Sequence, residues 1–582
     1  LLTENEEVYN NLFANVYALV NIPPIEGLSY RLNFSPNYRW EHNYNFFRQD
    51  KHLTYNTSSA SKYNKEAYDW VLENIITYKK NINENHYFDL TLLYGRHHTG
   101  FEETTASSNL LASDLLNWND LSLGETQTVK SGAQDSDGVS SMFRLNYRLM
   151  NKYMATFTIR RDGSSVFAEN NKYATFPSAS LAWIVSEEKF MNSLKDKFNM
   201  LKLRLSYGSV GNQAISPYQS LNTSLITKYV FGDGGTSSIG IYPSIMANHD
   251  LKWETTKTLN IALDYELFNS RLGGSIEVYN MDTKDLLVKR ALPVMTGYNS
   301  VWANLGATNN KGIEISINSK NIETKDFSWD TNLTFSHNKN KIVHLYKSDT
   351  DGDGKEDDDL GNLWFIGQPI NVAYDYVFDG IYQEGDELPS GYKPGFVRLK
   401  DLNKDGKIDA ANDRKIIGQT GQPDYRWGIT NTFKYKNITL SVFLNAMQGW
   451  ISTFNPLDMQ YFISGSGNYP NRPVNMIDYK EGWWTPENKS NTRPSFAYTN
   501  PYQHNYYISR NFVRIQDISL SYDFDKSLVN KWGFRDLRVS VSGKNLYTFT
   551  NWPGPDPESG YNTSGNFYPT PKTFVFSINT SF

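Results

Sequence analysis

The residues best suited to chemistry in this chain form an aspartate-rich stretch that begins at Asp401. Residues able to offer oxygen atoms alternate along it, and its sixth residue is Gly406. This spacing matches the first half of a calcium-binding loop, in which the chain turns sharply around a hard cation. The candidate ligands are Asp401, Asn403, Asp405, Lys407, Asp409 and Asp413.

The second half of this stretch departs from the calcium-loop pattern. Its twelfth residue is Asn412, where an EF-hand carries a glutamate that binds with both oxygens. Two interpretations stay open, a low-affinity calcium site and a water-filled acidic turn. Ca²⁺ is therefore the one cofactor that the sequence indicates, and the chain requires none.

A second acidic run resembles the first more loosely. Asp349, Asp351 and Asp353 alternate along it, and three further aspartates follow at 357–359. A solvated charged loop explains this run more simply than a metal site does. The run is kept as a weaker metal-site hypothesis.

Four tryptophans fall in segments that we expect to be loops. An indole ring can stack on the apolar face of a sugar or pack against a partner protein. Packing within the loops is the simpler interpretation. The four are Trp364, Trp450, Trp483 and Trp484.

Catalytic motifs do not appear. The chain has no GxSxG elbow, no phosphate-binding loop and no dinucleotide fingerprint. His97 and His98, near Glu102 and Glu103, lack the spacing of metal ligands and fit exposed polar positions. No pair of carboxylates stands out as a glycosidase pair. We therefore expect that the protein is not an enzyme.

The elements that carry these residues are strands. Segments of about ten residues alternate apolar and polar positions throughout, and LKLRLSYG at 201–208 is the clearest. The polar sides carry charges that suit a watery lumen better than a closed core. These charges are Arg144, Arg148, Asp264, Glu314, Arg426, Lys434 and Arg538.

The last ten residues form the most telling strand. One face is aromatic and apolar and the other is mostly small and polar, as in a strand of an outer-membrane barrel. The apolar face carries Phe574, Phe576, Ile578 and Phe582, and we interpret it as a membrane-assembly strand.

Short and long connections alternate along the chain. Tight turns at one rim and large loops at the other are typical of a transmembrane antiparallel β-barrel. We predict this all-β fold with roughly 17 strands. The long loops are expected near 40–65, 99–138, 210–255, 284–309, 339–423, 448–510 and 546–572.

Composition agrees with this prediction. The mean hydropathy is −0.56 and no run of about 18 apolar residues occurs, which excludes a membrane-spanning helix. Aromatic residues reach 15%, and Tyr and Trp favour membrane interfaces. The net charge of −5 gives no basic field for nucleic acid, and the absence of Cys excludes disulfides.

Five runs of residues resemble the SusC/RagA type of TonB-dependent transporters, and the similarity extends from about residue 11 to the end. Several motifs in the same order make coincidence an unsatisfactory explanation. The runs are YMATFTIRRDGSSVFAENNKYATFPSASLAWIVSEEKFM (153–191), LKLRLSYGSVGNQ (201–213), LKWETTKTLNIALDYELFNSRLGGSIEVYN (251–280), NKGIEISINSKNIETKDFSWDTNLTFSHNKNKI (310–342) and DLNKDGKIDAANDRKIIGQTGQPDYRWGITNTFKYKNITLSVFLNAMQGW (401–450).

The resemblance implies a barrel of about 22 strands in the outer membrane of a Gram-negative bacterium. It also implies an N-terminal plug, coupling to TonB, and a SusD-like surface lipoprotein that lids the barrel during import of oligosaccharides or peptides. We expect residues 1–582 to be the C-terminal part of such a barrel, without the plug and the first strands.

Two alternatives stay open. One is a TonB-dependent receptor for siderophores or corrinoids that works without a lipoprotein lid. The other is a structural barrel or adhesin whose loops bind surfaces. Cargo identity cannot be read from the sequence, because loop geometry determines it.

Overall fold

A computed structural model describes residues 3–49, 57–231, 235, 237–454, 482–495, 497–559 and 570–582. Within these ranges the chain consists mostly of antiparallel strands, as predicted, and no helix there has the length and apolar character needed to cross a membrane. Parts of four expected loops lie outside the described residues. These parts are 50–56, 232–234 with 236, 455–481 with 496, and 560–569.

The chain divides into two compact units. Unit 1 comprises residues up to Glu188, Leu203–Ile261 and Met281–Ala307, and unit 2 comprises Lys189–Lys202, Ala262–Asn280 and Thr308–Phe582. Four strands contribute residues to both units. They are β9 (Phe198–Asn212), β12 (Glu254–Leu267), β13 (Leu272–Lys284) and β16 (Ala307–Glu323).

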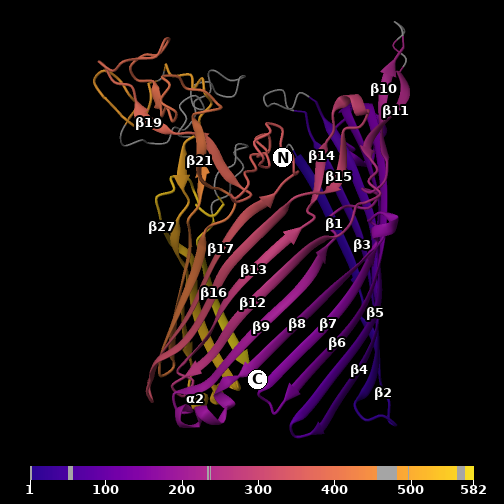
Figure 1. Cartoon of the computed structure of the whole chain (residues 1–582), viewed down its shortest axis with the longest axis vertical. Helices are drawn as coiled ribbons and strands as arrows, with labels where there is room; N and C mark the ends of the chain where they lie inside the picture. Colours follow the sequence, from indigo (N-terminus) through magenta and orange to yellow (C-terminus); the bar gives the residue numbers. More distant parts are fainter. Residues whose placement is uncertain are drawn as a thin grey trace. The chain divides into compact units, whose positions relative to one another are not determined.

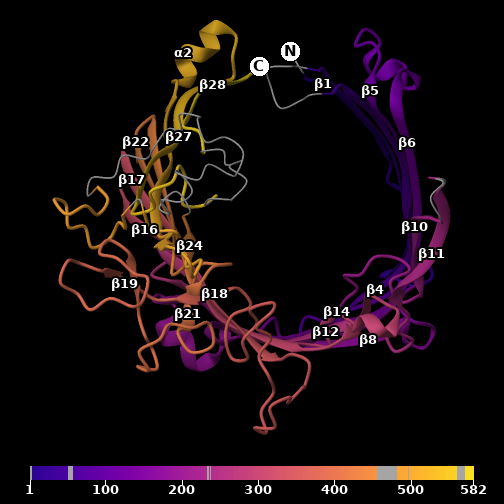
Figure 2. The ribbon, with the colours of Figure 1, turned by 90° about the horizontal axis from the view of Figure 1, so that it is seen from above.

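The wall of unit 1 is an antiparallel ladder in which each strand from β3 to β8 pairs with the next (Figure 1). β1 and β2 pair with successive parts of β3 and so share one strand position. Seen from above, this ladder forms an arc (Figure 2). Its strands are β1 (Thr3–Phe13), β2 (Val16–Asn21), β3 (Leu28–Phe47), β4 (Ser59–Asn83), β5 (His86–Leu111), β6 (Gly124–Leu149), β7 (Tyr153–Ser164) and β8 (Tyr173–Ile184).

The wall of unit 2 is a second antiparallel ladder. The long ladders together include 18 strands, and because β1 and β2 share a position, this agrees with the roughly 17 expected. The strands of this second ladder are β17 (Phe327–His344), β22 (Tyr425–Tyr435), β23 (Ile438–Gln448), β26 (Phe512–Asp523), β27 (Asp536–Thr550) and β28 (Thr573–Ser581).

The remaining elements are short and lie in the connections. In unit 1 they are β10 (Thr223–Val230), β11 (Ser237–Met246), β14 (Leu287–Ala291) and β15 (Ser300–Asn304). In unit 2 they are β18 (Val372–Tyr376), β19 (Phe378–Ile381), β20 (Val397–Leu399), β21 (Arg414–Gln419), β24 (Ile451–Thr453), β25 (Tyr507–Ser509) and α2 (Lys526–Val529). Short 3-10 turns occupy Asn117–Asn119, Leu121–Leu123, Glu169–Asn171, Val185–Glu187, Lys189–Leu194, Val294–Thr296 and Asn530–Trp532.

Each wall has an apolar face, which we call the belt face, and a polar face. Side chains alternate between the two faces along a strand, so residues that pair across neighbouring strands form a row on one face, and the next row lies on the other face. The belt face of unit 2 contains the row Phe576, Val541, Leu520, Leu440, Phe433 and Trp329. The polar face contains the neighbouring row Ser577, Ser540, Ser521, Thr439, Lys434 and Ser328.

Unit 1 repeats this division. Leu90, Leu145 and Phe157 stand side by side on its belt face, and Thr91, Arg144 and Thr158 form the next row on its polar face. The alternation read from the sequence therefore assigns these residues to the correct faces. Phe574, Phe576 and Ile578 of the last strand lie on the belt face, as predicted.

The tightest turns lie at one end of each wall, the turn rim, together with two longer connections at 185–197 and 524–535. The longest connections lie at the other end, the loop rim (Figure 1). Residues 84–85, 150–152, 324–326 and 436–437 are turns, and Asn151 and Lys436 have the positive φ that tight turns need. The sorting of connections by length is therefore confirmed within each unit.

The loops near 40–65 and 99–138 are shorter than expected. β4, β5 and β6 contain 25, 26 and 26 residues, so residues 99–111 and 124–138 are strand rather than loop. Their polar composition hid this from the sequence, but neighbouring strands satisfy their backbone groups whatever the side chains. A membrane requires only about 9–11 residues per strand, so these strands continue well beyond that length.

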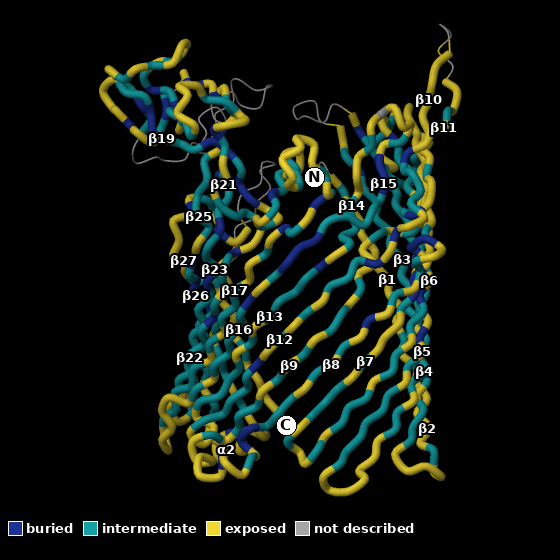
Figure 3. The backbone as a smooth tube through the Cα atoms, viewed as in Figure 1, coloured by how far each residue is buried: buried dark blue, intermediate teal, exposed yellow. Residues whose placement is uncertain are grey.

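Buried residues are most frequent near the loop rim (Figure 3). A smaller set, Val185, Ser186, Met191 and Val529, lies in segments that connect strands at the turn rim. In unit 1, Phe167, Leu251 and Trp253 belong to a cluster near the loop rim. In unit 2, Ile381, Val397 and Trp484 form the core of a small folded region built from the connections. The loops therefore have hydrophobic cores of their own, which fix the side chains they carry.

Candidate functional site

The polar face of unit 2 has two adjoining hollows. The larger has a volume of about 680 Å³ and the smaller about 410 Å³, and both include Ser275 and Ser316. Charged groups of both signs line them, and Lys202 Nζ lies 3.7 Å from an oxygen of Asp264. Asp264, Glu314 and Arg426, which the sequence places on the watery side, are among the lining residues. This face is suited to water and polar solutes.

The Asp401 loop has the backbone of a cation-binding turn. Asp401 accepts hydrogen bonds from the N–H groups of Lys404 (2.6 Å) and Gly406 (2.8 Å). Asn403 accepts from Asp405 N–H at 3.2 Å, and Asp405 accepts from Lys407 N–H at 2.8 Å. Gly406 has a φ of +81°, which L side chains rarely adopt. The structure thus draws Asp401, Asn403 and Asp405 around one turn.

Asp409 and Asp413 form a separate turn. Asp413 is fully buried, with 0% exposure, and its two oxygens accept the N–H groups of Leu402 and Asp409, both at 2.8 Å. Its carboxylate therefore closes the loop from within, and the expectation that Asp413 is a metal ligand is not supported by this geometry. Hydrogen bonds from Asn412 lower the pKa of the Asp409 carboxyl.

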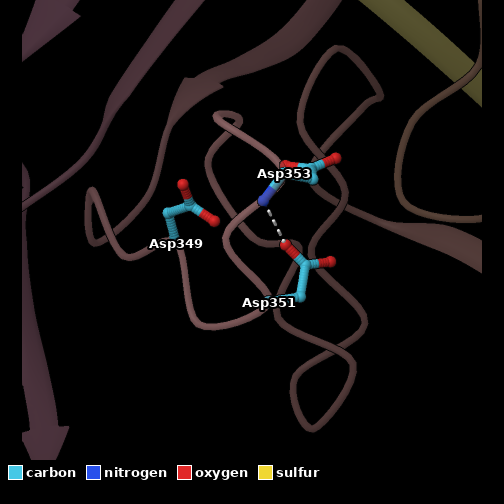
Figure 4. Close-up of side chains that lie close together, drawn as sticks. All are labelled: Asp349, Asp351 and Asp353. Atoms are coloured by element: carbon cyan, nitrogen blue, oxygen red, sulfur yellow. Dashed lines mark hydrogen bonds between the residues drawn. The ribbon is translucent and has the colours of Figure 1, made fainter.

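The Asp349 loop repeats this geometry. Asp349 accepts from the N–H groups of Gly352 (2.8 Å) and Gly354 (3.0 Å). Asp351 accepts from Asp353 N–H at 3.1 Å (Figure 4). Gly354 has a φ of +80°. One carboxylate oxygen from each of Asp349, Asp351 and Asp353 lies within 4.8 Å of the others. Such oxygens could hold a hard cation, so the run treated as weaker has the more compact acidic group.

The four tryptophans divide into two pairs. Trp450 and Trp484 are buried, with their Nε1 groups bonded to Arg510 O (3.2 Å) and Gln383 Oε1 (2.9 Å). Their rings pack inside the loops, so the simpler interpretation holds for them. Trp364 and Trp483 are half-buried at the loop rim and stay candidates for contact with a sugar or a partner.

His97 and His98 lie side by side in sequence but on opposite faces of β5. His98 Nδ1 lies 3.1 Å from an oxygen of Asp137, and its ring stacks on Trp70. In the described part of the chain, the three aspartates of the 349 loop are the only close group of acidic or histidine ligands. The two histidines therefore do not belong to a group of three such ligands there.

The sequence did not single out the hairpin of β10 and β11, which lay inside an expected loop. Its strands pair from Thr223–Ile245 to Val230–Ser237 and project at the loop rim of unit 1 (Figure 1). Ile226, Ile239 and Ile241 share one of its faces and are 71%, 72% and 72% exposed. The sequence did carry a hairpin signal, because a glycine-rich stretch separates two segments that are rich in apolar residues.

Comparisons with known proteins agree with this architecture. The model of a family described as "TonB dependent receptor-like, beta-barrel" matches residues 24–408. TonB-dependent receptor P3 of Formosa agariphila is 35% identical over 541 residues, which cover 88% of this chain and 52% of that protein. TonB-dependent receptor SusC of Bacteroides thetaiotaomicron is 32% identical over 464 residues, covering 76% and 44%.

A solved structure matches the fold across the whole chain. The RagAB peptide transporter superposes with a TM-score of 0.82 at 23% identity and covers 100% of this chain and 63% of that chain. At this identity the match concerns the fold. The chain spans less than two thirds of the length of each of these relatives.

Proposed function

Because the chain belongs to the family of TonB-dependent receptor-like β-barrels, we propose that it forms the larger part of the wall of a SusC-type importer in the outer membrane of a Gram-negative bacterium. The observation that carries this proposal is the division of each wall into an apolar and a polar face. The apolar row from Phe576 to Trp329 suits lipid, and the hollows lined with charge suit a polar cargo path.

The proposed cargo is an oligosaccharide or a peptide, and the proposed energy source is TonB acting on a plug contributed by another part of the full protein. The charged groups of both signs on the polar face would accept either kind of cargo. The wall itself carries out no chemistry in this scheme.

A SusD-like surface lipoprotein is the proposed partner. The β10–β11 hairpin supports this, because its exposed isoleucines are costly to leave in water and would be covered by another protein. The hairpin carries a single charged residue, Lys228, among its described residues, which favours an apolar contact.

We also propose that the Asp401 and Asp349 loops bind Ca²⁺ with low affinity. The shared hydrogen-bond pattern and the left-handed glycine at the sixth position of each loop support this. Calcium would order the loops of unit 2 and would take no part in transport chemistry.

The test is purification of the full-length protein from its native outer membrane in mild detergent, followed by mass spectrometry of everything that copurifies. An equimolar surface lipoprotein together with energy-dependent uptake of a glycan or peptide would support the proposal. Uptake of a metal chelate without a lipoprotein would favour a siderophore or corrinoid receptor. A barrel that arrives alone and imports nothing would favour an adhesin or structural role.

A further inference from the structure

Two arginines, Arg510 just before β26 and Arg514 within it, hold a segment of the last loop. The side chain of Arg514 is 3% exposed, and it donates hydrogen bonds to Asp556 at 2.7 Å and to Glu558 at 2.8 Å. Its Nε also donates to Thr548 Oγ1 at 3.0 Å. Asp556 is 4% exposed, so this ion pair is almost wholly removed from water.

Arg510 binds the backbone of the same segment. Its Nε donates to the carbonyl of Pro557 at 2.7 Å, and another guanidinium nitrogen donates to the carbonyl of Glu558 at 2.5 Å. The guanidinium also lies 3.7 Å from the ring centroid of Trp450. One cation thus joins the loop that follows β23 to the loop that follows β27.

The held segment is stiff. Its sequence from Trp552 to Glu558 is WPGPDPE, and three prolines fix φ along it. Trp552 is buried and packs edge-on against Phe454 with ring centroids 5.2 Å apart. The segment therefore gives up little conformational entropy when the arginines bind it.

The register shows on which face the segment lies. Val513 and Ile515, the two neighbours of Arg514 in β26, pair with Phe549 and Tyr547. These two aromatics are exposed and lie on the belt face. Arg514 therefore points to the polar face, and residues 552–558 lie against that face near the loop rim of unit 2.

We propose that Arg510 and Arg514 form a clasp that makes residues 552–558 a fixed part of the wall lining instead of a moving lid. Removing one partner of a buried ion pair leaves the other charged and desolvated, so the clasp resists opening. Arg510 and Arg514 are positioning residues, because they act through the segment that they hold. That this lining borders the cargo path rests on the proposed function, but the clasp itself does not.

The test uses a spin label on Ser559→Cys in the full-length protein reconstituted in lipid, since residues 1–582 contain no Cys. Electron paramagnetic resonance should show an immobile label in the parent. In Arg514→Met the mobile fraction should rise at least about tenfold. Arg514→Lys should give a partial rise, because one ammonium cannot bind two carboxylates as a guanidinium does.

The matched control is Arg538→Met, which removes an exposed ion pair with Asp523 at the turn rim of the same unit. It should leave the label immobile. If Arg514→Met fails to assemble, Asp556→Asn tests the same pair from the other side. A label that is equally mobile in the parent and in the Arg514 and Asp556 variants would overturn the clasp, whether or not the protein transports anything.

Discussion

At the scale of single residues, the acidic loops combine two kinds of carboxylate. Asp349 and Asp401 hold the turn that would surround a cation, whereas Asp413 is buried and holds the chain together. Alternate spacing in the sequence identified the first kind. It could not identify the second, because burial depends on residues distant in sequence.

Calcium removal should separate the proposed ion site from an ordinary acidic turn. We expect a chelator to lower the melting temperature of the purified protein by a few degrees, since a bound ligand stabilises only the folded state. The double variant Asp349→Asn with Asp401→Asn should not respond to the chelator. Differential scanning calorimetry with and without added Ca²⁺ measures both, and an unchanged parent melting temperature would refute calcium binding.

The Glu356 carboxylate holds the backbone beside the Asp349 loop, because it accepts hydrogen bonds from Leu345 N–H and Lys347 N–H. Burial acts to raise the pKa of the Glu356 carboxyl, but hydrogen bonds from Lys347 N–H, His344 and Leu345 N–H together hold the pKa below its usual range. A lowered carboxyl pKa gives stability that is present above the unfolded pKa of about 4 and is lost as the pH falls through the folded value.

We therefore expect amide-exchange protection at Leu345 and Lys347 to be complete above about pH 4 and to be lost as the pH falls further, through the lowered pKa of the folded state. Hydrogen exchange, corrected for the intrinsic effect of pH, measures this. Glu356→Gln should remove much of the protection at every pH. Unchanged protection of both amides in Glu356→Gln would contradict the role of this carboxylate.

At the scale of elements, the last strand should tolerate charge on one face and not on the other. Phe576→Lys should weaken insertion into lipid by about 2–4 kcal/mol, because it places an ammonium in hydrocarbon. Ser577→Lys is the matched control one residue away, on the polar face, and should cost much less. Folding titrations into lipid vesicles compare the two, and equal costs would contradict the assignment of the faces.

The strands show how far sequence reasoning reaches. The alternation of apolar and polar residues identified β9 and β28. It also placed Arg144 and Leu145 on opposite faces of β6, because each face meets a different environment. It missed the far halves of β5 and β6, where residues such as 102–109 (EETTASSN) have weak strand preference. Those halves are strands because their neighbours pair with them.

At the scale of the whole molecule, the β10–β11 hairpin should decide whether the proposed lipoprotein partner binds. Replacing Ile226, Ile239 and Ile241 with Ser should reduce the copurifying lipoprotein at least about tenfold, since a few buried apolar anchors carry most of an interface. Replacing Thr227, Ser237 and Ser238 with Ala on the same hairpin should have little effect. Quantitative mass spectrometry gives both ratios, and full retention in the isoleucine variant would exclude the hairpin as the docking element.

The uninterrupted pairing of β5 with β6 limits how this protein can change over evolutionary time. The pairing keeps one register from His86–Leu149 to Asn109–Thr126, so inserting a single residue would reverse the faces of everything beyond it. Odd-numbered insertions in such strands need a compensating bulge, like the one between Ile515 and Asp517 in β26. Gain and loss of residues during divergence should therefore concentrate at the loop rim, where they leave the pairing of the wall undisturbed.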